Sequence, residues 1–519
     1  MIRTRSVRAA AMLGTATLIL VGLSFAGLSL EGARRAIAPG RSESPGLHLG
    51  MRPYVRIGSQ VKPTGLRPGG VGPQYGLFSC QYGQSVATCY DPYEMRHAYG
   101  VDALIGGGYD GVGQTIVIVD AFQNPNIQAQ LSDFDAYYGL PDLHVSIVHP
   151  LGLTAFVPGN PTMTGWAEEI SLDVEWAHAI APGAQIVLLL APDDSDASLV
   201  GVLQYAVEHN LGDVISMSFG ENESCVDPQT QSAWHSALAS ATAKHITLLA
   251  SSGDQGAAQL SCDGTTWVQA VSAPASDPLV TSVGGTELHA AGYCFASLGC
   301  NPSTNPSPGT YQGEIAWNEG PPFGDFQGGF ASSMASGGGF SVVFDEPPYQ
   351  KRGVKAKKQR ALPDVAYNAA VYHGVITYLD VPGLAAGFYL FGGTSAGAPQ
   401  WAAIIAIANQ RAGGRLGFLS TAIYHVGQMK QSYSTAFHDV RAGNNSVVEY
   451  DYLAKPVTIG GFSAAAEWDA TTGNGSPAAA DLVDDLIRWV SPGDATAVLA
   501  NTKPKAHPKP AKPGKVKPH

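Results

Sequence analysis

Short apolar runs alternate with helical patterns over the middle of this 519-residue chain. The runs are rich in Val, Ile and Leu, which is typical of strands buried on both faces. They cover residues 113–122, 185–190, 213–218, 245–251 and 278–284. Such runs, separated by helices, predict an α/β fold with a doubly wound, mostly parallel sheet and helices on both faces. In such a sheet, the loops after the carboxyl ends of the strands build the functional site.

One predicted helix between the first two strands carries two acids on one face. It covers about residues 167–180 and is stopped by a proline followed by a glycine. Glu169 and Asp173 are four residues apart, so they lie side by side, and a covered pair of this kind would share a proton. A solvated acidic face is the alternative for such a pair. We assign Glu168 and Glu175 to that solvated face.

A serine between small residues precedes a long apolar helix pattern. The stretch FGGTSAGAPQWA, residues 391–402, places Ser395 among glycines and alanines, which let a substrate approach its hydroxyl. The apolar residues that follow predict a helix, whose free N–H groups and dipole favour negative charge near Ser395. This position suits a nucleophile. A Gly-rich turn capped by Ser or Thr before a core helix is the alternative.

The same letters also fit Gly-x-Ser-x-Gly, the nucleophile elbow of α/β-hydrolases, which would predict a lipase or esterase. Candidates for the acid and histidine that must follow the serine are Asp439, His425 and His438. However, the strand-rich part of the chain lies before Ser395, whereas that fold needs more sheet after its elbow. We therefore keep the esterase as a disfavoured alternative.

A third acid follows a predicted strand. Asp254 lies in SGDQG, a Gly-flanked loop directly after the strand at residues 245–251. Because the carboxyl ends of parallel strands face the functional site, Asp254 has the position of a site residue. An Asp that stabilises its own turn is the alternative.

Four motifs, EEISLD, SSGDQG, PASDPLVTSVGGT and GGTSAGAP, occur in this order, and together they resemble the sedolisin (serine-carboxyl peptidase) family. The similarity runs from about residue 90 to about residue 486. The resemblance implies a subtilisin-like fold and four catalytic residues: Ser395 as nucleophile, Glu169 as general base, Asp173 as its support and Asp254 as oxyanion donor. These roles are chemically consistent, because a carboxylate can take the serine proton and a protonated Asp254 can donate to the oxyanion.

The resemblance also implies one structural calcium ion. FHDV and GGFSAAAEWDATTG are similar to the calcium loop of the family and offer oxygen ligands, which calcium prefers. Alanine and glutamate replace the usual glycines before the Trp-Asp pair, so plain turn residues are the alternative. The implied ligands are the carboxylates of Asp439 and Asp469 and the backbone carbonyls of Val440, Ala465 and Glu467.

Charge and cysteine content restrict the partners and the compartment. The net charge of -12 argues against nucleic acid as a partner, since binding phosphates needs a basic face. Six cysteines, an even number, fit an oxidising compartment, although six cysteines allow fifteen pairings. We expect two local loops and one longer bridge: Cys80–Cys89, Cys294–Cys300 and Cys225–Cys262.

The composition changes along the chain predict four segments. Residues 1–26 are basic and then apolar, which predicts a signal peptide removed on export, with an uncleaved anchor as the alternative. Residues 27–78 form a Gly/Pro-rich leader or short propeptide without a strand period. Residues 79–490 form the peptidase domain, and residues 491–519 form a Lys/Pro-rich tail that we expect to be disordered.

Two basic stretches each have a structural interpretation and a functional alternative. Residues 351–360 are interpreted as a solvated loop, with a processing target or a contact for anionic cell surfaces as the alternatives. The tail is either inert or a contact for an anionic cell wall. After signal cleavage we expect no stable insertion into a membrane.

These patterns lead to a prediction of function. We expect a secreted, monomeric endopeptidase that hydrolyses proteins or peptides at acidic pH through an acyl-enzyme on Ser395. Acid conditions follow because Glu169 must be ionised as a base while Asp254 must be protonated as a donor. A catalytically inactive secreted binding protein on the same fold is the alternative.

Overall fold

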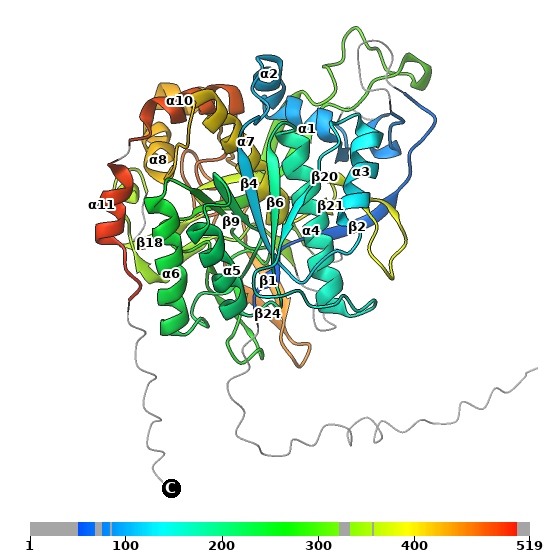
Figure 1. Ribbon diagram of the computed structural model, residues 1–519. Coiled ribbons are helices and arrows are strands. Elements are labelled where there is room, and N and C mark those ends of the chain that lie inside the picture. Colours follow the sequence, from blue (N-terminus) through cyan, green and yellow to red (C-terminus); the bar gives the residue numbers. More distant parts are fainter. Residues whose placement is uncertain are drawn as a thin grey trace, which may run out of the picture. The chain divides into compact units, whose positions relative to one another are not determined.

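Eight strands in the described part of the chain form a mostly parallel sheet, as the alternation of apolar runs and helical patterns predicted (Figure 1). The computed structural model describes residues 50–67, 75–83, 86–320, 333–354, 358–491 and 493–505. Along the sheet the order is β14-β13-β9-β7-β4-β6-β5, and β19 pairs with β13. The bounds are β4 (Thr115–Ala121), β5 (Ser146–Val148), β6 (Gln185–Ala191), β7 (Val214–Met217), β9 (Thr247–Ser251), β13 (Thr281–Ala290), β14 (Tyr311–Ala316) and β19 (Val365–Asn368).

The parallel pairing brings three polar residues to one edge of the sheet. β4 pairs in parallel with both β6 and β7, and β7 pairs in parallel with β9. Parallel strands end on the same edge, where Asp120, Ser218 and Asp254 stand at or just after the carboxyl ends of β4, β7 and β9.

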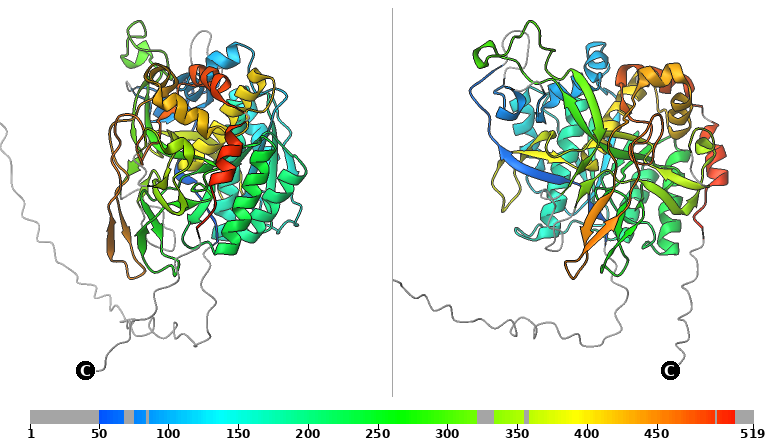
Figure 2. Two further views of the ribbon diagram at one scale, coloured as in Figure 1. Left: turned by 90° about the vertical axis from the view of Figure 1, so that its left-hand side faces the viewer. Right: turned by 180° about the vertical axis from the view of Figure 1, so that it is seen from behind.

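Helices cover both sides of this sheet. α4 packs against α7 and β4 on one side, whereas α5 and α6 pack against each other on the other side (Figures 1 and 2). The helices are α1 (Pro92–Ala98), α2 (Val101–Gly106), α3 (Ile127–Tyr138), α4 (Pro161–Ile180), α5 (Asp196–Glu208), α6 (Pro228–Ala243), α7 (Gly397–Ala412), α8 (Ser420–Gln428), α9 (Lys430–Ala436), α10 (Ala479–Trp489) and α11 (Asp494–Asn501).

The helix predicted at residues 167–180 is longer at its start. α4 begins at Pro161, because the Asn160 side chain accepts a hydrogen bond from the Met163 N–H at 3.1 Å and a proline suits the first helical position. The predicted end of the helix at Ile180 is confirmed.

Smaller sheets surround the main one. One has the order β2-β21-β20-β3 and another the order β1-β8-β12. Two-stranded pairs join β10 with β11, β15 with β16, β17 with β18, β22 with β25, and β23 with β24. The bounds are β1 (Arg52–Pro53), β2 (Arg56–Val61), β3 (Cys89–Tyr90), β8 (Phe219–Asn222), β10 (Ala258–Leu260), β11 (Trp267–Gln269), β12 (Ser272–Ala273), β15 (Asn318–Glu319), β16 (Met334–Ala335), β17 (Gly339–Asp345), β18 (Gln359–Leu362), β20 (Gly374–Leu379), β21 (Gly387–Gly392), β22 (Phe437–His438), β23 (Val447–Tyr450), β24 (Pro456–Ile459) and β25 (Ser476–Pro477).

The prediction of a leader without strands is wrong for its described part. β1 pairs antiparallel with β8, and β2 pairs antiparallel with β21. Met51, Tyr54 and Val55 are buried. Both partner strands come from distant parts of the chain, so local periodicity could not reveal this pairing. The predicted signal peptide, residues 1–26, lies outside the described residues.

The prediction of a disordered tail from residue 491 is wrong at its start. α11 forms there and packs against α6, with Ala495 and Val498 buried. Residues 506–519 lie outside the described part. Within the described ranges, every helix is too short or too polar to span a bilayer.

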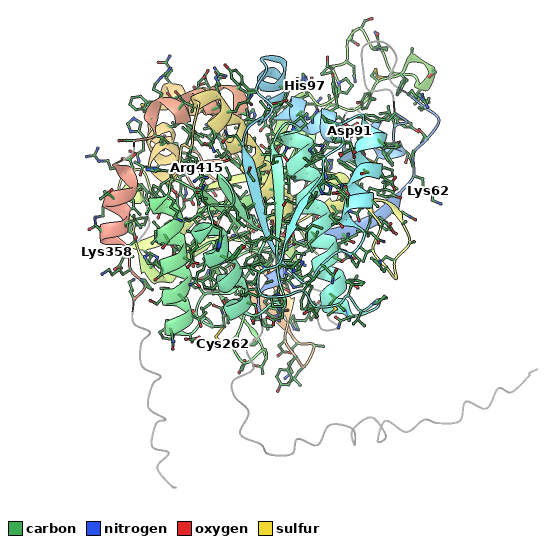
Figure 3. All side chains as sticks on the ribbon, in the orientation of Figure 1. Lys62, Asp91, His97, Cys262, Lys358 and Arg415 are labelled. Carbon is green, nitrogen blue, oxygen red and sulfur yellow. A yellow bond between two sulfur atoms is a disulfide. The ribbon has the colours of Figure 1, made fainter. Side chains whose placement is uncertain are left out.

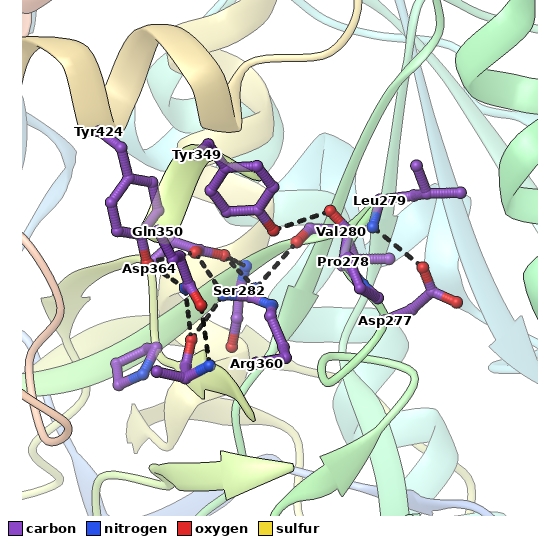
Figure 4. A network of polar contacts seen from close by, with 12 residues as sticks. Asp277, Pro278, Leu279, Val280, Ser282, Tyr349, Gln350, Arg360, Asp364 and Tyr424 are labelled. Carbon is purple, nitrogen blue, oxygen red and sulfur yellow. Dashed lines mark hydrogen bonds and ion pairs between the residues drawn. The ribbon is translucent and has the colours of Figure 1, made fainter. Parts of the chain in front are cut away.

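The interpretation of residues 351–360 as a solvated loop is wrong for Arg360. β18 carries this arginine into the interior, where its guanidinium binds both carboxylate oxygens of Asp364 at 2.7 and 2.5 Å (Figure 4). Tyr424 donates to the same carboxylate at 2.8 Å. A buried charge is retained here because it is paired and hydrogen-bonded.

The three expected disulfides are confirmed. Cys80 bonds to Cys89 and Cys294 to Cys300 as local loops. Cys262, labelled in Figure 3, bonds to Cys225 across a separation of 37 residues.

Candidate active site

Ser395 lies in a short 3-10 turn, Thr394–Ala396, that leads into α7. The side chain is fully buried. Gly393 directly before the turn has a φ of +92°, a conformation that favours glycine. The predicted position at the start of a buried apolar helix is therefore confirmed.

Glu169 and Asp173 face the interior rather than solvent. Both are fully buried on α4, which packs against α7 and the turn that carries Ser395. Ser218 connects the pair to the serine: its hydroxyl donates to Asp173 Oδ1 at 2.9 Å, and its carbonyl oxygen accepts from Ser395 Oγ at 3.2 Å. The solvated-face alternative is therefore excluded for Glu169 and Asp173.

The buried acids cannot all be charged at once. Burial raises the pKa of Glu169 well above its usual value, and the neighbouring charges of Asp173 and Asp120 raise it further, whereas a hydrogen bond with Ser395 opposes the increase. Burial also raises the pKa of Asp173 to about 8, although hydrogen bonds from Ser218 and Glu169 oppose it. Burial raises the pKa of Asp120, and the neighbouring negative charge of Asp173 raises it further. Such a group shares protons and titrates as a unit.

Asp254 lies beside the serine turn with its two oxygens in different surroundings. Oδ1 accepts hydrogen bonds from the Thr394 N–H at 2.8 Å and the Thr394 hydroxyl at 2.7 Å. Oδ2 lies 3.1 Å from Arg56 Nε. A Cβ added to Gly393 would lie only 2.6 Å from Oδ2, so this oxygen faces the backbone just before Ser395.

One acid assigned to solvent is in fact buried. Glu175 accepts from Gln130 Nε2 at 2.8 Å and from the Tyr378 N–H at 2.9 Å. The prediction of a solvated Glu175 is therefore wrong, because a helix covered by both α3 and β20 has little free face. Glu168 is half-buried.

The residues that an esterase would need have other partners. The His425 ring packs on Trp489 at a centroid distance of 4.3 Å, and the His438 ring stacks on Tyr311 at 3.8 Å. The structure thus brings the sedolisin-type set to Ser395.

Sequence reasoning missed three residues that contact this set, namely Ser218, Thr394 and Arg56. Ser218 is the last residue of a predicted strand, and Thr394 stands in the recognised motif directly before the serine. Arg56 carried no signal, because its partner Asp254 is almost 200 residues away.

The implied calcium ligands meet at one loop. Asp439 Oδ1 accepts from the Glu467 N–H at 3.0 Å, and Asp469 Oδ2 accepts from the Ala465 N–H at 3.1 Å. Arg441 Nε donates to Asp439 Oδ2 at 2.7 Å. The oxygen donors fit a hard cation, but the guanidinium of Arg441 would have to turn away from Asp439 to admit one.

Another cluster of metal-type ligands in the described residues consists of Glu287, His289 and His373. Glu287 Oε1 lies 3.0 Å from His289 Nε2 and 3.7 Å from His373 Nε2. Contacts between a carboxylate and two imidazoles account for this cluster.

Comparison with known proteins identifies the family. The model of the subtilase family (Peptidase_S8) matches residues 159–446, more than half of the chain. The chain belongs to the subtilase family. The matched range includes Glu169, Asp173, Asp254 and Ser395.

The predicted membership of the sedolisin family is also confirmed. Kumamolisin from Bacillus sp. (strain MN-32) is 30% identical over 421 residues, which cover 79% of this chain and 66% of kumamolisin. Sedolisin from Pseudomonas sp. (strain 101) is 31% identical over 317 residues, which cover 59% of this chain and 47% of sedolisin. The chain thus matches less than two thirds of the length of these curated relatives.

A solved structure supports the same conclusion. Pseudomonas sedolisin, a serine-carboxyl proteinase complexed with two molecules of pseudo-iodotyrostatin, has a TM-score of 0.61 and 26% identity to this chain. The match covers 78% of this chain and 99% of that one. The predicted subtilisin-like α/β fold is confirmed, and the prediction of a serine-type peptidase is borne out at the level of the family.

Proposed function

We propose that the chain is a secreted serine-type endopeptidase that hydrolyses proteins or peptides at acidic pH through an acyl-enzyme on Ser395. The observation that supports this most is the convergence of a buried serine, a buried acid pair on one helix, and a third buried acid beside the serine turn. A binding scaffold has no need of three buried acids around one hydroxyl, because burying each one costs free energy.

The acid pair would supply the general base. Glu169 takes the proton of Ser395 once the hydroxyl hydrogen rotates from the Ser218 carbonyl toward the carboxylate, since a hydroxyl hydrogen turns to suit its acceptor. Asp173 lies one helical turn away and is held by Ser218, so it positions Glu169 and shares its proton.

Asp254 would stabilise the oxyanion. Thr394 fixes Oδ1 with two hydrogen bonds, so a proton on this acid would reside on Oδ2, the oxygen that faces the backbone before Ser395. A protonated Oδ2 can donate a hydrogen bond to the charge that develops on the substrate carbonyl. An ionised Asp254 would instead repel that charge.

Acidic conditions therefore set the working range. Burial raises the pKa of Glu169, Asp173 and Asp120, so the limb on which the base gains its proton lies above the usual pKa of a free carboxyl group. As the pH rises, the donor proton is lost, and as the pH falls, the base is neutralised. We expect a bell-shaped profile of kcat/KM whose two limbs belong to the coupled group.

Substitution at the nucleophile and base tests the proposal. Ser395→Ala abolishes turnover of a peptide library at acidic pH, and Glu169→Gln reduces kcat/KM by about 10²-fold or more, because general-base catalysis contributes about that much. Mass spectrometry of the digests measures both. Glu168→Gln, on the neighbouring position of the same helix, serves as the matched control and keeps activity near that of the unmodified protein. Digestion by Ser395→Ala protein at the unmodified rate contradicts the assignment.

We also propose that one calcium ion binds at the loop of Asp439 and Asp469, with the carbonyl oxygens of Val440, Ala465 and Glu467 completing the ligands. The support is the meeting of both carboxylates at residues 465–469 and the oxygen-only donor set. Arg441 competes with the ion for Asp439.

Thermal melts of the Ser395→Ala protein, which removes self-digestion, test this site. Calcium at about 100 times its Kd adds about 2.7 kcal/mol of stability, so melts with calcium and with chelator separate. Arg441→Gln removes the competing cation and should enlarge the difference, whereas Asp439→Asn should shrink it. Superimposable melts of both the parent and the Arg441→Gln protein would exclude the site.

A further inference from the structure

The cluster of Glu287, His289 and His373 brings three metal-type ligand atoms together. Glu287 and His289 stand two residues apart on β13, so their side chains share one face of the strand. His373 comes from a distant part of the chain, directly before β20. The three ligand atoms all lie within 4.8 Å of one another. The fold thus gathers one carboxylate and two imidazoles from two separate segments.

The distances between these atoms resemble those between ligands of one small cation. Glu287 Oε1 lies 3.0 Å from His289 Nε2 and 3.7 Å from His373 Nε2. Zinc binds such ligands at about 2.1 Å, and two ligands in tetrahedral directions are then about 3.4 Å apart. A zinc ion therefore fits between the three atoms with only small shifts of the side chains.

A hydrogen bond on the far side of the His373 ring directs its Nε2 lone pair at the cluster. Nδ1 lies 2.9 Å from the carbonyl oxygen of Ala87, which can only accept, so Nδ1 carries a hydrogen. In the neutral ring, Nε2 is then an acceptor that faces another acceptor, Glu287 Oε1. This contact is favourable only if a proton or a metal cation lies between the two atoms. A histidine that binds a metal commonly donates its other N–H to a backbone carbonyl in this way.

The loop that carries His373 is held in place by side chains around it. Asn368 Nδ2 donates to the His373 carbonyl oxygen at 2.7 Å, and Asn368 Oδ1 accepts from the Leu288 N–H at 3.0 Å. Leu288 lies between the two ligands on β13, so Asn368 connects both segments of the cluster. Glu319 also accepts from the Tyr372 N–H at 2.7 Å. Ligands that are already positioned need little rearrangement to bind an ion.

Exposure and ligand type indicate which ions the cluster would accept. His373 is buried, whereas Glu287 and His289 are half-buried, so an ion can enter from solvent. Two imidazole nitrogens favour zinc and similar transition metals, whereas calcium and magnesium prefer oxygen ligands. Three protein ligands leave a fourth tetrahedral position for water.

We propose that Glu287, His289 and His373 bind one zinc ion or a similar divalent transition-metal ion, with water as the fourth ligand. The bound ion joins β13 of the main sheet to residues 369–373, the loop that leads into β20. This site shares no ligand with the proposed calcium loop, and the inference does not depend on the proposed peptidase function.

The ion acts on stability. It fixes a loop that also supports the serine turn, because the Ala369 carbonyl oxygen accepts from the Gly393 N–H at 2.7 Å. Gly393 stands two residues before Ser395. A metal ion that binds only the folded chain raises the free energy of unfolding, so zinc should stabilise the protein.

Calorimetric titration of the full-length Ser395→Ala protein, stripped of metal by a chelator, provides the first test. At about pH 7.5, where free imidazoles are mostly neutral, and with calcium in excess, Zn²⁺ should bind at one ion per chain. His289→Ala and Glu287→Gln should each weaken binding at least about tenfold, since losing even an outer partner of a ligand costs about that much. His149→Ala, at an exposed histidine outside the cluster, is the matched control and should bind zinc as the parent does.

Thermal melts of the same proteins provide the second test. Saturating Zn²⁺ should raise the melting temperature of the parent and of His149→Ala by at least about 2 °C, and should leave that of His289→Ala and Glu287→Gln unchanged. Matching circular dichroism spectra without metal show that the variants are folded. Equal zinc affinity in the parent, His289→Ala and Glu287→Gln would place the ion elsewhere and overturn the inference, and so would a parent protein that binds no zinc.

Discussion

At the scale of single residues, the arrangement of Asp254 decides what it can contribute. Thr394 donates two hydrogen bonds to Oδ1, so this oxygen acts as an acceptor. Oδ2 is the oxygen that can carry a proton or pair with Arg56. The same atom therefore either pairs with Arg56 or donates to an oxyanion, and its protonation state distinguishes the two roles.

Asp254→Asn separates the donor role from the charge. The amide oxygen can accept from Thr394 as Oδ1 does, and the amide nitrogen donates at every pH. We expect the alkaline limb of kcat/KM on a neutral peptide to move toward neutral pH, because a donor that cannot ionise is not lost there. Asp263→Asn, at an exposed acid, is the control and should leave the limb in place. An unchanged alkaline limb in Asp254→Asn would show that another group sets it.

Candidate catalytic residues could be predicted where a single short motif contains both the reactive side chains and their spacing. Ser395 is marked by small neighbours, and Glu169 and Asp173 by a helical spacing of four. What could not be predicted is burial: Glu175 stands two positions after Asp173 and looks equally exposed in the sequence, yet Gln130 and Tyr378 bind it in the interior. Contacts between residues far apart in the chain, such as Arg56 with Asp254, leave no local pattern.

At the scale of elements, a buried ion pair connects β18 to the strand that follows it. Arg360 binds Asp364 through both carboxylate oxygens, and the Ser282 N–H donates to Asp364 Oδ2 at 2.7 Å (Figure 4). Burial lowers the pKa of Arg360, but the charge of Asp364 outweighs burial and raises it overall. The pair also attaches β18 to β13, which carries Ser282.

Arg360→Leu should therefore lower the free energy of unfolding by about 3–5 kcal/mol, because it leaves the carboxylate of Asp364 buried without its cation. Urea unfolding of the Ser395→Ala protein, followed by tryptophan fluorescence, measures the change. Lys351→Leu, at an exposed position of the same basic stretch, is the matched control and should alter stability by no more than about 0.5 kcal/mol. Equal stability of Arg360→Leu and the parent would mean that the pair does not stabilise the junction.

Elements of the main sheet were predictable because each is a continuous apolar run. β4, β7 and β9 lie within the predicted ranges and β6 ends one residue beyond its range, since strands buried on both faces need apolar residues at successive positions. β1 and β2 were missed because one has two residues and the other carries polar residues on an edge. Their stability comes from β8 and β21, so only the fold reveals them.

At the scale of the whole molecule, buried carboxyl groups dominate the electrostatics. Burial is the largest cause of the raised pKa in each case, and the pKa is about 7 for Asp135, about 8 for Asp173 and Glu449, and about 9 for Glu221. The pKa of each of four further acids is raised well above its usual range: Glu94, Asp120, Glu169 and Glu175. In the unfolded chain these groups would titrate near 4.

This difference predicts how stability depends on pH. Between about pH 4 and pH 9 the folded chain binds more protons than the unfolded chain, so the free energy of unfolding falls as the pH rises, by about 1.4 kcal/mol per pH unit for each proton of difference. The contribution of these acids is fully present below the unfolded pKa and is lost as the pH rises through the folded pKa. Three histidines oppose it, because burial lowers the pKa of His178 to about 4 and also lowers the pKa of His373 and His438, but the eight acids outnumber them.

We therefore expect the Ser395→Ala protein to be more stable at pH 5 than at pH 8, with a melting temperature at least about 5 °C higher, since the buried acids outnumber the buried histidines. Calorimetry in buffers of equal ionic strength measures the shift. Glu221→Gln removes one proton-binding group and should reduce the difference between the two pH values, whereas Glu208→Gln, at an exposed acid, should not. A melting temperature that rises from pH 5 to pH 8 would mean that these acids are ionised in the folded protein, and it would also remove the electrostatic basis for a site that works in acid.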